Sequence, residues 1–272
     1  MGVINAMCIK GNSAMTFNPA ELKHLNAEFA HYELAVALKA LRQRFSGKIA
    51  FSSSLGLEDQ VITDAIFSQA LAIEVFTLDT GRQFPENYAT LDATLKKYAQ
   101  PIRVLYPNTE AIERYVSNEG INALYASVAQ RKACCAIRKI EPLNRALQGV
   151  EVWITGLRAA QSAYRSDMQL FEWDESRNLL KFNPLLHWSL PEVRAYIAEH
   201  AVPYNPLHDQ GFPSIGCQPC TRAITVGEDE RAGRWWWESA NQECGLHDGT
   251  SAQAFKSINR LGLTSAETKT HD

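Results

Sequence analysis

The sequence predicts an α/β fold in which helices flank a parallel sheet. Two observations carry the prediction. Four short apolar runs are typical of β-strands and cover residues 48–51, 73–78, 102–106 and 150–155. Helical stretches separate them or follow them, over residues 58–70, 84–98, 133–147 and 189–200. Alternation of strands and helices favours βαβ units, and short runs that are apolar throughout are typical of strands covered on both faces.

The first and last parts of the chain differ from this core. Before residue 46 we expect helix, because Asn18, Pro19 and Glu21 provide a cap, a first-turn proline and a capping-box glutamate. After residue 203, Pro, Gly, Cys and Trp interrupt the pattern and indicate a loop-rich segment. Within one structural domain overall, we expect an N-terminal helical region (1–45), an α/β nucleotide-binding core (46–202) and a C-terminal region (203–272).

Composition excludes several classes of protein. Of the 272 residues, 46% are hydrophobic and 21% are charged, which excludes a wholly disordered chain. The net charge is -3 and the pI is about 6.2, so no basic field points to nucleic acid. The chain has no apolar run of the ~18–20 residues that a bilayer span needs. We therefore expect a cytoplasmic protein that contacts neither nucleic acid nor a membrane.

Three of the predicted strands end in polar turns, at residues 52–56, 79–82 and 156–158. Ligands of parallel α/β sheets bind beyond the carboxyl ends of the strands, so these turns are candidate binding loops. The serines of the first turn precede a helix, an arrangement that suits an anion. Taken alone the turn is more typical of a helix cap, because it matches neither a Walker A nor a G-x-G-x-x-G motif.

Four of the six cysteines form two pairs, the adjacent Cys134 and Cys135 and the C-x-x-C of Cys217 and Cys220. A chain of this size in a reducing compartment needs no disulfide framework, which favours metal or redox chemistry. Four thiolates suit either zinc or an iron–sulfur cluster. Adjacent cysteines reach two irons of a cluster more easily than one tetrahedral ion, so the cluster is favoured and zinc stays open.

Cys244 stands apart in the polar sequence QECGLH, where His247 could support its thiolate. A reactive thiol and an ordinary loop cysteine are equally compatible with these features. Cys8, near the N-terminus, is interpreted as an ordinary cysteine.

These motifs together resemble the assimilatory adenylyl-sulfate (APS) reductases, the iron–sulfur branch of the APS/PAPS reductase family. The segments that carry the resemblance are CCAIRK (134–139), CQPC (217–220), GEDERAGRWWWE (227–238) and ECGLH (243–247), with support from 52–59, 78–81 and 156–158. The resemblance implies a fold of the PP-loop, adenine nucleotide alpha hydrolase-like type. It implies thioredoxin-dependent reduction of APS to sulfite and AMP in sulfate assimilation and cysteine biosynthesis, with a glutaredoxin-like protein as the alternative donor. It is also compatible with a homo-oligomer.

The resemblance also implies roles for individual residues. Cys134, Cys135, Cys217 and Cys220 would hold a [4Fe–4S] cluster, and Cys244 would be the nucleophile that becomes an S-sulfocysteine. Lys139, Arg231 and Arg234 match basic residues associated with the phosphosulfate, and Arg165 is a looser match. The remaining substrate-binding candidates come from the strand ends: Ser52, Ser53, Ser54, Gly56, Thr80, Gly81, Gly156 and Arg158. Lys139 and His247 are candidates for catalytic support.

The chain departs from related patterns at two places. The loop SSSLGLED (52–59) replaces the S-G-G-x-D-S signature of ATP-using relatives, which favours a reductase over an ATP-dependent RNA thiolation enzyme. Asn241 and Gln242 precede the ECG segment, where a basic residue is common. A PAPS reductase or a dual-substrate reductase is the nearest alternative. A zinc-stabilised nucleic-acid-binding protein is more distant, because the pI is acidic.

Overall fold

Six strands form one sheet in the order β3-β2-β1-β4-β6-β5. This computed structural model describes residues 18–161, 165 and 167–238. The strands are β1 (Lys48–Ser53), β2 (Glu74–Leu78), β3 (Arg103–Leu105), β4 (Val150–Ile154), β5 (Phe171–Asp174) and β6 (Leu179–Phe182). All neighbours pair in parallel except β5, which is antiparallel to β6 at the edge. The predicted α/β fold with a parallel sheet is confirmed, with this antiparallel edge strand added.

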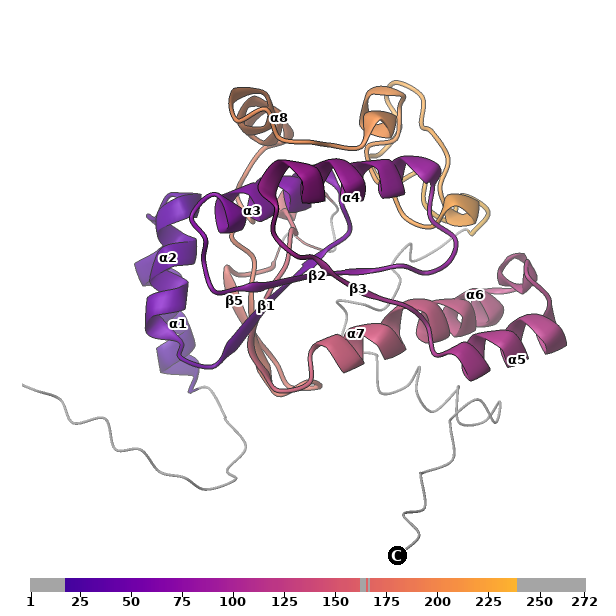
Figure 1. Ribbon diagram of the computed structural model, residues 1–272, viewed down its shortest axis with the longest axis horizontal. Helices are drawn as coiled ribbons and strands as arrows, with labels where there is room; N and C mark the ends of the chain where they lie inside the picture. The colour runs from indigo at the N-terminus through magenta and orange to yellow at the C-terminus, as the bar shows by residue number, and fades with distance from the viewer. Residues whose placement is uncertain (1–17, 162–164, 166, 239–272) are drawn as a thin grey trace, which may run out of the picture.

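Helices pack on both faces of the sheet (Figure 1). The α-helices are α1 (Pro19–Phe29), α2 (Leu34–Arg44), α3 (Leu57–Phe67), α4 (Pro85–Tyr98), α5 (Thr109–Glu119), α6 (Val128–Cys135), α7 (Glu141–Ala146) and α8 (Leu190–Glu199). The capping boxes predicted at Asn18 and Ser189 are both present, at the starts of α1 and α8. Among the described residues, none of the helices combines the length and the apolar character needed to cross a membrane.

The strands are apolar on both faces because each face covers a separate core. Ile49 and Phe51 of β1 pack in a cluster with residues of α1, α2, α3 and α8. Ala50, between them in the sequence, points to the opposite face and packs in a second cluster with Leu143 of α7. Figure 1 shows α3, α4 and α8 on one side of the sheet and α5, α6 and α7 on the other.

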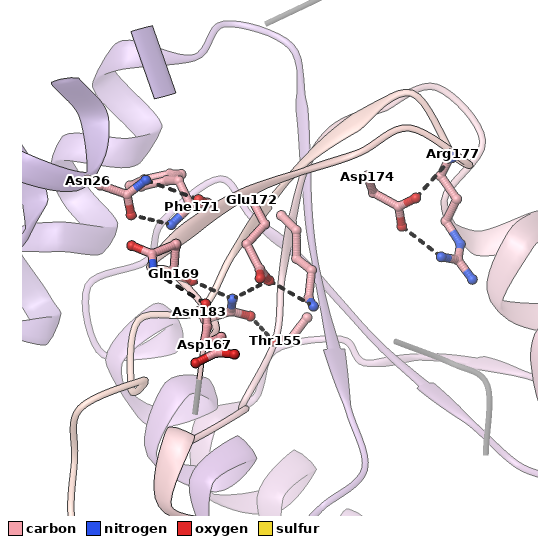
Figure 2. Close-up of polar contacts among 10 residues, drawn as sticks. Asn26, Thr155, Asp167, Gln169, Phe171, Glu172, Asp174, Arg177 and Asn183 are labelled. Atoms are coloured by element: carbon pink, nitrogen blue, oxygen red, sulfur yellow. Dashed lines mark hydrogen bonds and ion pairs between the residues drawn. The ribbon is translucent and has the colours of Figure 1, made fainter. Parts of the chain in front are cut away.

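The β5–β6 edge is fastened to the core by polar contacts (Figure 2). Asn26 of α1 bonds to both backbone groups of Phe171, donating to its carbonyl at 3.1 Å and accepting from its N–H at 2.9 Å. The Thr155 hydroxyl, just after β4, donates to Asn183 Oδ1 at 2.6 Å, and Asn183 Nδ2 donates to Glu172 at 3.1 Å. These bonds fix the end of β4, where a candidate binding loop begins.

A third buried cluster lies beside the sheet and contains the paired cysteines. It joins α5, α6 and the segment near residue 235, with Tyr115, Ile137 and Trp235 at its centre. Between α6 and α7 the chain forms a π-helical segment, η2 (Ala136–Ile140). The single helix predicted over 133–147 is therefore a longer helical run that contains a π segment, a feature often found at functional sites.

The strand order reverses between β1 and β4. From β1 the chain adds β2 and β3 on one side, and from β4 it adds β6 and β5 on the other. In parallel α/β sheets such a reversal opens a crevice at the carboxyl ends of the two strands, where the connecting loops diverge. The fold therefore places residues 52–56 and 155–158 beside each other.

Candidate active site

A cavity of about 200 Å³ occupies this crevice. Its walls include the carboxyl end of β1 with the loop that follows it (Ser52, Ser53, Ser54 and Gly56) and the turn after β4 (Thr155, Gly156 and Leu157). The C-terminal region contributes residues 213–216 and 230, 231 and 234. The structure thus brings two of the three predicted strand-end turns together with the loop-rich segment.

Three serines lie at the carboxyl end of β1, Ser52 and Ser53 as its last residues and Ser54 directly after it, and their hydroxyl groups hold this end in place. Ser52 Oγ accepts a hydrogen bond from Trp153 Nε1 at 2.8 Å, and Ser53 Oγ accepts from the N–H of Leu55 at 3.1 Å. Each hydroxyl still has its hydrogen to donate, which suits a bound anion. Ser54 differs, because its hydroxyl donates to Asp59 at 2.6 Å.

Four cationic side chains line the cavity: Lys139, Arg165, Arg231 and Arg234. The three arginines are each less than a tenth exposed. Arg234 is held by stacking on the Trp235 ring, 4.6 Å from its centroid, and by a 3.3 Å bond to Ser214. Its side chain lies against Gly216, where a Cβ atom would clash with the guanidinium. Buried arginines that converge on one cavity are suited to bind an anion with several oxygens.

Acidic side chains line the same cavity: Glu58, Asp59 and Glu230. Burial is the largest influence on Asp59 and raises its pKa to about 7, although the Ser54 N–H and hydroxyl hydrogen bonds oppose the shift. Gly156 lies against Asp59, and a Cβ atom there would clash with the carboxylate. These acids were not predicted from the sequence, because an anion site favours cations and no motif singled out the acids.

Arg158 does not line the cavity, although it was a candidate substrate-binding residue. Its guanidinium is about 1% exposed and lies between two carboxylates. Nε donates to Glu58 at 2.6 Å, and Nη2 donates to Glu230 at 3.0 Å. Arg158 therefore connects α3 to the segment that carries Arg231 and holds two acids of the cavity wall in place.

The paired cysteines converge on a second, smaller pocket. Cys134, Cys135, Cys217 and Cys220 are free and buried, and all four line this pocket. Arg82, Arg131, Arg138 and Lys139 line it as well, so the sulfur atoms have cationic neighbours. Within the described part of the chain, no group of three His, Cys, Asp or Glu side chains is arranged to hold a single metal ion.

The cationic neighbours act unequally on the thiols. Burial raises the pKa of Cys217, but Lys139, the Thr80 hydroxyl and Arg234 together outweigh burial, so this pKa lies below its ordinary value. Burial and the nearby Cys217 raise the pKa of Cys220 to about 11. Of these two thiols, the pocket therefore favours the thiolate form at Cys217.

Neither Thr80 nor Gly81 lines the larger cavity, and Thr80 contacts a cysteine of the smaller pocket. Thr80 Oγ1 is 3.2 Å from Cys217 Sγ, and the Thr80 carbonyl accepts a 2.6 Å hydrogen bond from Arg138. The turn after β2 thus supports the cysteines, whereas the sequence analysis assigned both residues to substrate binding.

Lys139 lines both the cavity and the cysteine pocket. It belongs to η2, four residues after Cys135. Cys134 and Cys135 end α6 directly before this π-helical segment, and Lys139 lies near the end of the segment. An ammonium group in that position couples the electrostatics of the two pockets.

Cys244 and His247 lie outside the described residues, as does Cys8. The description ends at Glu238, which α6 holds through Arg131. Glu238 lies six residues before Cys244 in the sequence, and its partner Arg131 lines the pocket of the paired cysteines.

Comparison with known proteins agrees with this geometry. Residues 48–223 match the phosphoadenosine phosphosulfate reductase domain. The chain belongs to this family. A protein of Sinorhizobium fredii (strain NBRC 101917 / NGR234) named adenosine 5'-phosphosulfate reductase is 50% identical over 237 residues, 87% of this chain and 94% of that protein. A protein of the same name from Allochromatium vinosum is 52% identical over 216 residues, 78% of this chain and 84% of that protein.

A solved structure of the same family shares the fold. The crystal structure of the phosphoadenylyl-sulfate (PAPS) reductase from Candida auris in complex with phosphate has a TM-score of 0.68 and 27% sequence identity. The match covers 77% of this chain and all of the Candida chain. The range that matches the family, residues 48–223, therefore includes the sheet and both cysteine pairs, and the cavity residues Glu230, Arg231 and Arg234 follow it.

Proposed function

We propose that the protein reduces adenosine 5'-phosphosulfate to sulfite and AMP, with thioredoxin or a glutaredoxin-like protein as the electron donor. One observation carries the proposal: four cations from three separate segments line a cavity at the switch point of a mostly parallel α/β sheet. Sequence identities of 50% and 52% to proteins named adenosine 5'-phosphosulfate reductase support the choice of substrate. We expect the enzyme to act in the cytoplasm, where donor thiols are kept reduced.

The substrate would bind with its nucleoside against the turns after β1 and β4 and its phosphosulfate among the cations. Arg231 and Arg234 present planar guanidinium groups, which bind tetrahedral oxyanions through paired hydrogen bonds. Lys139 adds a point charge from η2. The buried position of the arginines strengthens each of these interactions relative to water.

In the reaction the thiolate of Cys244 would attack the sulfur atom of the phosphosulfate. A bond forms between the two sulfurs, the bond from sulfur to the bridging oxygen breaks, and AMP leaves with the electron pair of that bond. The cations stabilise the charge that develops on the phosphate oxygen. A donor thiolate then attacks Cys244 Sγ and releases sulfite, and a second donor thiol resolves the mixed disulfide. His247 and Lys139 are the candidates to favour the Cys244 thiolate.

We propose further that the cysteine pocket holds a [4Fe–4S] cluster. Four buried free thiols in one pocket, with cationic neighbours that offset negative charge, fit the ligand requirements of such a cluster. When bound it would supply a fixed charge beside Lys139 and hold α6 to the C-x-x-C segment. In the proposed mechanism Cys244 alone bonds to the substrate.

The charges of the cavity support APS over PAPS as the substrate. PAPS carries an additional phosphate on the ribose 3′-oxygen, which would need a cation of its own. The two arginines at the strand ends are already engaged elsewhere. Arg158 pairs with two carboxylates, and Arg82 lies at the cysteine pocket, where it donates to Asn122 and to the carbonyl of Ile121. Neither lines the cavity in which a 3′-phosphate would have to bind. PAPS reduction is the second candidate, since the family and the Candida auris structure carry that name.

The covalent adduct is the most specific test of the mechanism. Protein incubated with APS and no thiol donor should gain roughly the mass of one SO₃ group, and peptide mapping should assign it to Cys244. Cys244→Ser should gain nothing, and Cys8→Ser, the matched control, should react like the unmodified chain. An adduct on another cysteine, or none under any condition, would contradict the proposal.

A further inference from the structure

His208 is a buried polar residue of the cavity wall that the proposed mechanism does not use. It lines the cavity and is about 7% exposed. The backbone of Phe212 lies close to the ring, but within the described residues neither ring nitrogen has a hydrogen-bond partner of proper geometry. Buried polar groups are almost always hydrogen-bonded, so two unsatisfied nitrogens in a cavity wall indicate a ligand contact.

The backbone around His208 is fixed. The residue belongs to the short 3₁₀ helix η5 (Pro206–Asp209), which Asn205 caps by accepting from the N–H of Leu207 at 3.0 Å. Asn205 also donates to Asn87 of α4 at 2.9 Å. The His208 carbonyl accepts a 3.1 Å bond from Arg194 of α8. The backbone that carries the ring is therefore held by contacts to two helices before a ligand binds, which lowers the cost of ordering this part of the wall.

The charge around the ring favours a neutral imidazole. Burial is the largest influence and lowers the pKa of His208, with Arg194 acting in the same direction and Glu58 and Asp209 opposing it. A neutral imidazole offers one donor and one acceptor. Its neighbour in the cavity wall, Glu58, is an acceptor with one oxygen bonded to Arg158. This combination suits a neutral hydroxyl, which both donates and accepts, and does not suit an anion.

We propose that His208 and Glu58 bind the ribose hydroxyl groups of the nucleotide and that this pair rejects a phosphate on them. The inference rests on the proposed function, because it assumes that the cavity binds an adenine nucleotide. Carboxylates are the usual partners of ribose hydroxyls in nucleotide sites, and the imidazole adds a second polar contact. A 3′-phosphate placed there would meet a carboxylate and a neutral ring instead of a cation, which gives a physical basis for selectivity against PAPS.

The test is a set of binding cycles between variants and nucleotides, measured by calorimetry on the full chain. AMP, 2′-deoxy-AMP and 3′-deoxy-AMP are compared on the unmodified protein, His208→Leu and His208→Gln. We expect His208→Leu to weaken the binding of AMP by about tenfold, as for one lost hydrogen bond. The affinity for at least one of the two deoxy analogues should not change, because that analogue lacks the hydroxyl that His208 binds. His208→Gln should retain part of the affinity. His187→Leu, at an exposed histidine outside the cavity lining, is the matched control.

The same cycles separate the inference from the function on which it rests. If His208→Leu weakens the binding of all three nucleotides by the same factor, or does not weaken the binding of any of them, His208 does not bind the ribose. If the unmodified protein binds no AMP, the proposed function itself fails. If His208→Leu does not fold, the ring ¹⁵N chemical shifts of the unmodified protein provide the test. The shifts of His208 must change when AMP binds, and they must change less when one of the deoxy analogues binds.

Selection against the 3′-phosphate is tested with adenosine 3′,5′-bisphosphate. The unmodified protein should bind it at least tenfold more weakly than AMP, and Glu58→Gln should narrow that difference because it removes a negative charge. Equal affinity of the unmodified protein for the two nucleotides would overturn this part of the proposal.

Discussion

Arg131 and Glu238 form a buried bidentate ion pair, with two hydrogen bonds of 2.8 Å each. Their side chains are 1% and 3% exposed. Arg131 also lies 4.7 Å from the centre of the Trp235 ring, whose environment includes Arg234 as well. One ion pair thus ties α6, which carries two of the cysteines, to the segment that carries two arginines of the cavity.

We expect Glu238→Gln to destabilise the fold, because it removes the carboxylate that pairs with the buried Arg131 guanidinium. The loss in the free energy of unfolding should be about 3–5 kcal/mol. Urea unfolding measures it. Lys96→Ala is the control, since its pair with Asp92 is exposed and should contribute no more than about 0.5 kcal/mol. Equal losses in the two variants would show that the buried pair does not anchor the segment.

Removing either cavity arginine should weaken binding of APS. Arg231→Ala and Arg234→Ala should each cost about 1.5–3 kcal/mol of binding free energy, the range for charge-assisted hydrogen bonds. Calorimetric titration with APS measures the change. Arg222→Ala is the control within the same region, because Arg222 pairs with Glu228 and does not line the cavity. If both variants bind APS as tightly as the unmodified protein, Arg231 and Arg234 have a structural role and do not bind the substrate.

Asp59 should make stability depend on pH. Its pKa of about 7 in the folded state lies above the ordinary 3.8, so the folded state holds a proton that the unfolded chain has released. Stability is then lost as the pH rises towards that value, by roughly 2–3 kcal/mol between about pH 5 and pH 8. Asp59→Asn cannot titrate at this position. Between about pH 5 and pH 8 its free energy of unfolding should therefore fall by roughly 2–3 kcal/mol less than that of the unmodified protein. Urea unfolding at a series of pH values measures this. If the free energy of unfolding of the two proteins depends on pH in the same way, the assignment is refuted.

The four paired cysteines should bind iron and Cys244 should not. We expect serine at position 134, 135, 217 or 220 to lower the iron content and the stability, because ligation contributes to folding. Cys244→Ser should keep both iron and colour. Iron analysis and the visible spectrum of anaerobically purified protein test this. Loss of iron from Cys244→Ser, or a colourless unmodified protein, would contradict the cluster.

Periodicity was enough to predict β1 to β4 but not the last two strands. β5 and β6 are four residues each, too short to show a period, and Lys181 interrupts the apolar character of β6. Lys181 is buried all the same, because it pairs with Glu172 on β5 at 3.2 Å. Only the tertiary pairing makes this charge compatible with a central position, and a single sequence does not contain that information.

Two helices could have been found from signals that were present. α5 begins after Asn108, whose side chain accepts from the N–H of Ala111, and α6 begins after Ser127, which accepts from Gln130. Both are ordinary N-cap residues. The π-helical segment after α6 has no N-cap residue of this kind, and Pro142, two residues after its end, is the one helix-breaking residue beside it.

The candidate site was predictable where the chemistry is local and not where it depends on packing. The cysteine spacing indicated one pocket, and the structure brings the four thiols together. Arg158 and His208 illustrate the limit. An arginine at a strand end suggested a ligand contact, but Glu58 and Glu230 bury it. No motif in the sequence singled out His208, and only the folded chain places it in the cavity wall.

Sulfite release with reduced thioredoxin, measured in parallel for APS and PAPS, tests the central claim most directly. The account predicts turnover of APS to sulfite and AMP with a kcat/KM at least ~10²-fold above that for PAPS, about 2.7 kcal/mol in transition-state binding. Absence of sulfite from APS would contradict the proposed function. Equal efficiency with PAPS would mean that a cation reaches the ribose, contrary to the acidic and neutral wall formed by Glu58 and His208.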